Sequence, residues 1–483
     1  MRPPPPAAAP PFEEQLSALQ AALQAVVEEF SSFYNASLSV GVHGSLFGRR
    51  HVDVKAAAGA NDYSRAAASR LSTDTLVPMG SATKLFSTVS VLRLAEAGVI
   101  DLDEAVQPLI DAYLTRNVPC NTRQHGTYCE LTCEPQLSKI FDCGQNRSSH
   151  PECNQILPRC MAECEGYYHC IGVADPPTLT DIFEGDQRVA KITFRHLVGL
   201  QSGLRDYDDW LLYETLDTPP RDITPIEYLA HMDHGLLFEP GSGAAYSTNG
   251  FSLVGLALAG KLGKTWWHEV DQRELAWGHE RYDDDRTTFP VTGTCLENAC
   301  LDHADGHCPP ESMAHQYFSN ARQPTPGQPW YADGRPADRT FVDITGQSCL
   351  NSWMGGNVAA RAIDAARFVY EAYSNRSVLL NSTSRAAMRA FHPITIGWGA
   401  GLLGYGLGTM VGADLQPFSS CGLTTIGHPG EDYGSGAPFN YYVPELDLAM
   451  NVAITSSHDG VSGMACDLRY SQACSPVTSR DLL

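Results

Sequence analysis

The order of strand-like and helix-like patterns restricts the fold of this chain more than any other feature. Two strand-like stretches with a turn near Gly48 occupy residues 38–62, and Gly-rich turns alternate with strand-like runs again at residues 403–457. Helical periodicity dominates between them, at residues 81–98, 192–203, 224–235 and 360–375, and it also precedes the first strands at residues 13–34. This order predicts an α/β fold of the α+β sandwich type, built from both chain ends, with a mainly helical lobe inserted and a site in the cleft between them.

Fifteen cysteines add a second constraint, because twelve of them fall in two segments. Eight lie between Cys120 and Cys170, inside a polar segment at about 115–176, and four lie between Cys295 and Cys349, around a loop-rich segment at about 283–348. Such clusters are typical of disulfides formed in an oxidising compartment. C-x-x-C pairs are absent, so we expect disulfide-rich insertions and no metal site or cofactor.

Charge and composition exclude several classes of partner. The chain of 483 residues is 43% hydrophobic, which is typical of a globular protein, and its formal net charge is −22. Because nucleic acids and anionic membranes both attract positive surfaces, neither is an expected partner. No apolar run is long enough to span a membrane. We expect residues 1–14 to be a disordered Pro-rich leader. Four N-x-S/T sequons favour a secreted or secretory-pathway location, although no signal peptide is visible.

The stretch VPMGSATKLF places Ser81 three residues before Lys84 at the start of a predicted helix. Side chains three apart lie on one helical face, so the lysine amine can reach the serine oxygen. A serine hydroxyl needs a neighbouring base to act as a nucleophile, and a lysine that is held neutral can supply one. An N-cap serine beside a solvated lysine remains the alternative, because this short motif also arises by chance.

Two further motifs favour a catalytic interpretation of Ser81 and Lys84. The stretch AYSTNG contains Tyr246 and Asn249, and IGHPGE contains His428 between a glycine and a proline. In this order the three motifs resemble those of the serine β-lactamase and penicillin-binding-protein superfamily. They are most similar to its class C β-lactamase-like branch of esterases and D-aminopeptidases. The resemblance covers about residues 15–110, 190–275 and 350–470, and it implies one catalytic domain at 15–483 with an antiparallel sheet flanked by helices.

The resemblance also implies a role for each motif residue. Ser81 would accept the acyl group, and Lys84 would take or relay its proton. Tyr246 would act as general base and then as acid to the leaving group, with its ionisation favoured by the positive charge of Lys84. Asn249 would orient Lys84 or a substrate carbonyl.

The third motif would line the substrate and oxyanion site with His428, Gly430 and Glu431. The backbone N–H groups of Ser81 and Glu431 would form the oxyanion hole.

His428 departs from the penicillin-recognising members of the superfamily, which carry a lysine there. A histidine is mostly neutral at pH 7, so it binds a substrate carboxylate less well. We therefore expect an esterase-like serine hydrolase that acts on a small-molecule or peptide-like acyl substrate. A D-aminopeptidase or β-lactamase-type amidase, a structural role for His428, and a non-catalytic secreted binding protein remain alternatives. A Ser-His-Asp hydrolase is disfavoured, because no G-x-S-x-G motif is present.

Overall fold

The computed structural model describes ten stretches of the chain. They are residues 10–34, 36–63, 69–117, 178–206, 222–231, 234–299, 312–319, 341–412, 422–432 and 434–457. Residues 1–9 of the expected leader and 118–177 of the first cysteine-rich segment lie outside the described residues, as do parts of 283–348.

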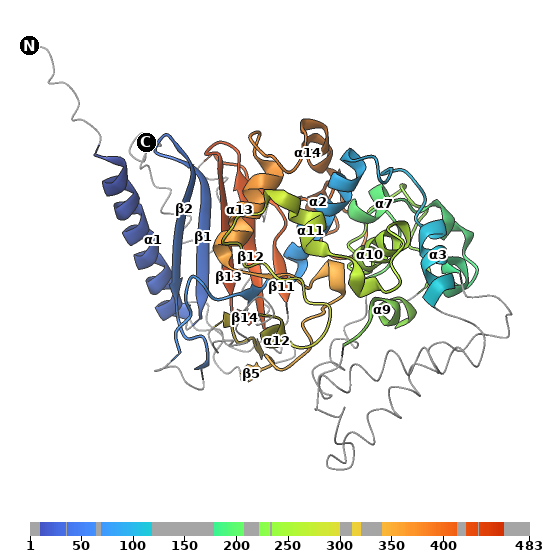
Figure 1. Cartoon of the computed structure of the whole chain (residues 1–483), viewed down its shortest axis with the longest axis horizontal. Helices are drawn as coiled ribbons and strands as arrows, with labels where there is room; N and C mark the ends of the chain where they lie inside the picture. Colours follow the sequence, from blue (N-terminus) through green and yellow to red (C-terminus); the bar gives the residue numbers. More distant parts are fainter. Residues whose placement is uncertain are drawn as a thin grey trace, which may run out of the picture.

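A large antiparallel sheet forms the centre of the described structure (Figure 1). It has nine strands within the described residues, eight of them in one continuous order, and β11 (Gly430–Asp432) pairs with β12 outside that order. The continuous order is β2 (Arg49–Ala58), β1 (Leu38–Leu46), β13 (Leu448–Ile454), β12 (Ser435–Val443), β10 (Ile426–Gly427), β9 (Met410–Gly412), β8 (Leu403–Tyr405) and β7 (His392–Pro393).

Strands from the two chain ends lie next to each other in this sheet. Strand β1 pairs with β2 on one side and with β13 on the other, and Val40 lies opposite both Ala56 and Val452. Gly48 has φ +76°, a conformation that glycine adopts without steric cost, and it makes the predicted turn between β1 and β2. The expectation of an antiparallel sheet flanked by helices is therefore confirmed.

Helices cover both faces of the sheet. Helix α1 (Phe12–Tyr34) packs against β2, where Val27 joins Leu38, Val40 and Ala56 in a small apolar cluster. Helix α13 (Ala362–Tyr373) packs against β1, β12 and β13 on the other face (Figure 1). The two layers bury the apolar side chains of the strands, which is the main favourable term in folding.

The remaining helices form the second part of the fold, around α10 (Asn249–Lys261). Residues 249–259 of α10 are all buried, as expected for a helix that is apolar on every side. Helix α10 contacts α2 (Thr83–Glu96), α3 (Gln107–Asn117), α7 (Phe194–Val198) and α9 (Pro225–His231). Helix α6 (Leu179–Ile182) packs against α3, α11 (Gln272–Trp277) packs against α2, and α14 spans Ser382–Met388.

One helix ends earlier than its sequence pattern predicts. We expected helix to Gly203, but α7 ends at Val198 and Gly199 follows as its C-cap. Leu200 has φ +57° and Gly203 has φ +82°, so the backbone turns out of the helical conformation at both positions. The chain thereby reaches residues 205 and 206, which contact the loop before α10.

The described part of 283–348 contains short regular elements as well as loops. Helix α12 (Cys295–Ala299) begins at Cys295, which forms a disulfide with Cys349 at a Cα–Cα distance of 4.7 Å. Both of these cysteines are therefore bridged, as predicted. A three-stranded sheet contains β4 (Tyr317–Ser319), β5 (Phe341–Asp343) and β14 (Ser456–Ser457), and β3 (Val77–Pro78) pairs with β6 (Ala359–Ala360).

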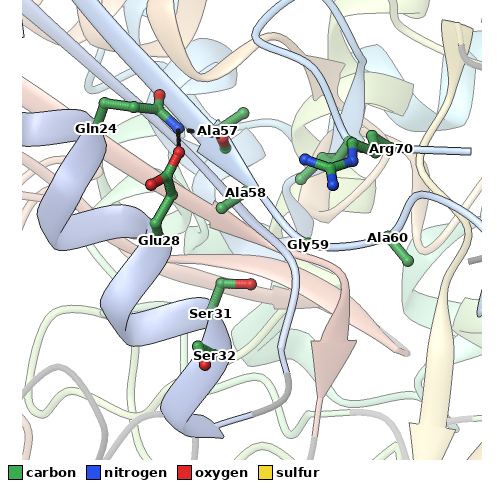
Figure 2. A pocket seen from close by; sticks show the side chains of 10 residues that line it. Gln24, Glu28, Ser31, Ser32, Ala57, Ala58, Gly59, Ala60 and Arg70 are labelled. Atoms are coloured by element: carbon green, nitrogen blue, oxygen red, sulfur yellow. Dashed lines mark hydrogen bonds between the residues drawn. The ribbon is translucent and has the colours of Figure 1, made fainter. Parts of the chain in front are cut away.

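A hollow of about 320 Å³ lies between α1 and the end of β2, and Figure 2 shows Gln24 and Glu28 on its helical side and Arg70 across from them. It contains none of the site residues predicted from the sequence. Among the described helices, none is both long and apolar enough to cross a membrane.

Candidate active site

Ser81 lies in a short 3₁₀ turn, η2 (Gly80–Ala82), immediately before α2 begins at Thr83. The α-helix therefore begins two residues later than the sequence predicted, and Ser81 stands on the turn that leads into it. Gly80 has φ +53°, and a Cβ atom there would lie 2.0 Å from the carbonyl oxygen of Glu431. Only glycine permits this close approach of the turn to β11.

Lys84 occupies the first turn of α2, and its side chain is fully buried. Its Nζ lies 2.8 Å from Ser81 Oγ and donates a hydrogen bond to the Gly355 carbonyl oxygen at 3.0 Å. Gly355 belongs to the turn η7 (Trp353–Gly355), which packs against α2 and α10. This contact was not predicted from the sequence.

Tyr246 comes from the loop before α10, 165 residues along the chain from Ser81. Its Oη donates a hydrogen bond to Ser81 Oγ at 2.8 Å. The loop is anchored from the other side: Ser247 Oγ donates to the Arg205 carbonyl oxygen, and the Thr248 N–H donates to Asp206 Oδ1 at 2.7 Å. The structure thus brings together the hydroxyl, the amine and the phenol that the sequence placed in two separate motifs.

Burial controls the charge state of this group. Desolvation lowers the pKa of Lys84 from 10.5 to about 7, against a smaller opposing effect of the Asp206 carboxylate. Desolvation also raises the pKa of Tyr246 well above its usual value, and the hydrogen bond to Ser81 only partly offsets this. In the resting state the amine therefore loses its proton more readily than the phenol, and the promotion of Tyr246 ionisation by Lys84 stays a prediction.

Asn249 lies at the start of α10 and is fully buried. Its Nδ2 donates to the Arg205 carbonyl oxygen at 3.2 Å, and its Oδ1 has no hydrogen-bond partner within the described structure. The predicted contact with Lys84 is not present. In this arrangement Asn249 supports the segment that carries Asp206, and its unpaired oxygen remains in the interior.

His428 follows β10 directly and is fully buried. Its Nδ1 lies 2.6 Å from the Pro429 carbonyl oxygen, and its ring centroid is 6.4 Å from that of Tyr246. Desolvation, reinforced by the charge of Lys84, lowers the pKa of His428 to about 3. The ring is therefore uncharged at neutral pH, as the sequence led us to expect.

Gly430 and Glu431 lie in β11, against the turn that holds Ser81. A Cβ atom on Gly430 would lie 2.8 Å from the Ser81 backbone nitrogen, so the two backbones are in direct contact. Glu431 pairs with Gly436 of β12 and its side chain is exposed. His428, Gly430 and Glu431 therefore lie in or directly beside β10 and β11, the two short strands that pair with β12, whereas Asn249 lies on α10.

Trp398 is a neighbour of the site that was not predicted from the sequence. Its ring centroid lies 5.1 Å from that of Tyr246, in an edge-to-face arrangement, and its side chain is 62% exposed. Ile396 and Leu402 of the same loop are also exposed, at 39% and 67%. The only sequence signal is the stretch IGWGAGL, in which a large aromatic residue stands between glycines.

Comparisons with solved structures show where this architecture recurs. The D-amino acid amidase from Ochrobactrum anthropi SV3, in complex with D-phenylalanine, has 17% identity and a TM-score of 0.59, covering 95% of this chain and 99% of that chain. The octameric penicillin-binding protein homologue from Pyrococcus abyssi has 16% identity and a TM-score of 0.52, covering 96% of this chain and 77% of that chain.

A third solved structure, EstCE1, a hydrolase with promiscuous acyltransferase activity, has 16% identity and a TM-score of 0.50, covering 95% of this chain and 98% of that chain. At these identities the likenesses show the fold alone. No curated protein sequence matches the chain. The Beta-lactamase family model, by contrast, matches residues 23–474, which is most of the length of the chain. The protein therefore belongs to the Beta-lactamase family, whose fold is that of serine hydrolases.

Proposed function

We propose that the protein hydrolyses carboxylic esters of uncharged acyl groups through an acyl-enzyme intermediate on Ser81. One observation carries this proposal: Ser81 Oγ lies 2.8 Å from both Lys84 Nζ and Tyr246 Oη, and the pKa of Lys84 is lowered to about 7. A serine hydroxyl in contact with a base that is about half deprotonated at pH 7 is the arrangement that nucleophilic catalysis requires.

In the acylation step the neutral amine of Lys84 accepts the Ser81 proton while Oγ attacks the substrate carbonyl carbon. The Gly355 carbonyl oxygen accepts an N–H from the same amine and orients its lone pair toward Ser81. When the tetrahedral intermediate collapses, the leaving oxygen takes the phenolic proton of Tyr246, and Lys84 returns its extra proton to the phenolate. The alcohol leaves, and Ser81 carries the acyl group as an ester.

Deacylation repeats these transfers with water as the nucleophile. The amine of Lys84, with Tyr246 as relay, accepts a proton from the attacking water, and Ser81 Oγ regains a proton as the acid leaves. In both steps negative charge develops on the carbonyl oxygen. We place this oxygen between the backbone N–H groups of Ser81 and Glu431, and the contact of β11 with the η2 turn supports this position.

The surroundings of Ser81 favour an uncharged, apolar acyl group. His428, which occupies the position of the superfamily's lysine, is neutral at pH 7, so it offers no permanent charge to a substrate carboxylate. Trp398 presents exposed apolar surface beside Tyr246, Ile396 is paired with the adjacent Ala245, and Leu402 of the same loop is also exposed. Burial of such surface by an acyl chain is favourable by about 25 cal/mol per Å².

A second candidate function is the hydrolysis of an amide whose acyl group carries a free amine. Asp206 is close enough to raise the pKa values of both Lys84 and Tyr246, so negative charge is present at the site. A substrate ammonium group would be attracted to it. The fold similarity to a D-amino acid amidase is consistent with this alternative.

A substrate panel separates these functions. Short and medium acyl esters, D- and L-amino acid amides and a chromogenic cephalosporin would be compared at equal concentration, with Ser81→Ala as the control for each. We expect neutral esters to give the highest kcat/KM, and Ser81→Ala to abolish it. Faster turnover of D-amino acid amides would establish the second candidate, and a folded protein inactive on all three classes would contradict both.

We also propose that the protein matures in the secretory pathway and works outside the cytosol. The Cys295–Cys349 disulfide supports an oxidising compartment. Expression in a eukaryotic secretory host should give a mass that falls after treatment with an N-glycosidase. An unglycosylated product with free thiols at both cysteines would contradict this location.

A further inference from the structure

Four polar side chains from separate elements meet on the α13 face of the sheet, away from the Ser81 group. They are His43 on β1, His51 on β2, Glu371 on α13 and Tyr282 on the loop after α11. No hydrogen bond within the described structure joins these four residues to Ser81, Lys84 or Tyr246. The role of this cluster is therefore independent of the proposed ester hydrolysis.

The four ligand atoms have the spacing of a tetrahedral metal site. Tyr282 Oη lies 3.1 Å from His43 Nε2, 3.4 Å from His51 Nδ1 and 3.1 Å from Glu371 Oε1. His51 Nδ1 and Glu371 Oε1 are 4.0 Å apart, and the three ligand atoms of the histidines and the glutamate all lie within 4.8 Å of one another. A tetrahedral Zn²⁺ with bonds of about 2.0–2.2 Å requires ligand atoms about 3.4 Å apart.

The hydrogen-bond partners of His43 and Tyr282 suit a cation at the centre of this group. His43 Nδ1 lies 2.6 Å from Asp53 Oδ1, so the carboxylate orients the ring, and the other ring nitrogen, Nε2, faces Tyr282 Oη at 3.1 Å. The phenol of Tyr282 has a single proton, so it can donate a hydrogen bond to only one of His43, His51 and Glu371 at a time. The carboxylate–histidine pair is the arrangement that orients histidine ligands in zinc sites.

The charges and packing around the group suit a divalent cation. Arg367 lies near the ring of Tyr282, but its guanidinium is paired with Asp53 and with Asp284. The side chains of His43 and Glu371 are almost fully buried, at 1% and 5% exposed, while that of His51 is 50% exposed. The buried ligands would hold the ion, and the exposed imidazole gives it a path from solvent.

We propose that His43, His51, Glu371 and Tyr282 bind one Zn²⁺ ion that fastens the β1–β2 hairpin to α13 and to the loop after α11. Four protein ligands close the coordination sphere, so the site is structural. Binding releases the phenolic proton of Tyr282 to solvent, together with any proton on the two imidazoles.

The test uses the full chain with its disulfides intact, stripped of metal by a chelator and then titrated with Zn²⁺ by calorimetry. His51→Ala is the main variant, because its side chain is half exposed and its loss should not prevent folding. Glu371→Gln, which keeps the shape of the side chain, is the second. His279→Ala is the matched control, since His279 lies close to Tyr282 in the chain with its side chain 88% exposed.

We expect wild type and His279→Ala to bind one Zn²⁺ with equal affinity and to show a higher Tm with the ion. His51→Ala and Glu371→Gln should bind it more than about 100-fold more weakly, because even an outer partner of a zinc ligand is worth about 10- to 100-fold. Substituted Co²⁺ should give the intense visible bands of a tetrahedral site in wild type and His279→Ala only. Equal Zn²⁺ affinity in wild type and His51→Ala, or no binding in folded wild type, would overturn the proposal.

Discussion

The lowered pKa of Lys84 makes a quantitative prediction for the pH dependence of acylation. Burial moves this pKa from 10.5 to about 7. At pH 7 about half of the molecules then carry the neutral amine, compared with about one in three thousand for an ordinary lysine. At 1.36 kcal/mol per pKa unit, the shift corresponds to about 5 kcal/mol of preference for the neutral form.

The direction of the effect follows from the base role of the amine. Protonated Lys84 cannot accept the Ser81 proton, so kcat/KM should fall about tenfold per pH unit below about 7 and reach a plateau above it. Tyr246 should not add a second pH-dependent change in kcat/KM near neutral pH, because its pKa is raised. His428 adds none either, because its pKa is about 3.

The assay measures kcat/KM for a neutral ester with a non-ionising leaving group, from about pH 5 to about pH 9. His428→Gln, which replaces the neighbouring imidazole with a side chain that cannot titrate, should keep the midpoint of the profile near 7 even if the rate itself changes. A flat profile, or a midpoint above about 9, would refute the assignment of Lys84 as the neutral base.

The same shift has a consequence for stability. Because the folded chain releases the Lys84 proton at a lower pH than the unfolded chain, the unfolded state binds more protons between pH about 7 and 10.5. The free energy of unfolding should therefore rise with pH from about 7 to about 9 relative to that of Lys84→Met, which lacks the group. Parallel curves for the two proteins in denaturant titrations would show that Lys84 keeps its ordinary pKa in the fold.

Four substitutions extend these predictions to the rest of the site. Tyr246→Phe should lower kcat by about 10²- to 10⁴-fold with little change in KM, and near-normal turnover would remove the phenol from the mechanism. Gly430→Ala puts a Cβ atom 2.8 Å from the Ser81 backbone nitrogen, so the free energy of unfolding should fall by about 1–3 kcal/mol and steady-state activity should drop. A fully active variant would argue against that contact. Trp398→Ala should raise KM about tenfold for long apolar acyl esters and leave acetate esters unchanged, and an equal effect on both would place the ring outside the acyl site. His428→Lys should improve hydrolysis of carboxylate-bearing substrates, and unchanged selectivity would show that this position does not sense substrate charge.

The elements that the sequence predicted best are those with strong local patterns. Residues 38–58 form two strands around the turn at Gly48, and α1 covers the helical stretch predicted at 13–34, so both were recognisable without the structure. The end of α7 was not, because Leu200 takes a left-handed conformation that the pattern of apolar residues does not encode.

At the site, too, the sequence predicted the contacts between residues that are close in the chain better than those between distant ones. Ser81 and Lys84 are three residues apart, so their proximity follows from local geometry, whereas Tyr246 was placed beside them only by the order of family motifs. The Gly355 carbonyl contact is made by the backbone and has no side-chain signature. Tyr282 and Glu371 are far along the chain from the β1–β2 hairpin that carries His43 and His51, and no short metal-binding motif joins the four residues, so only the fold shows that they converge.

The most direct measurement of the central claim is the covalent modification of the protein by a fluorophosphonate, followed by peptide mass spectrometry. A nucleophile that is activated as proposed should carry the phosphonyl group at Ser81, and the Lys84→Ala protein should label far more slowly. A label on another serine, or none on a folded wild-type protein, would contradict the account.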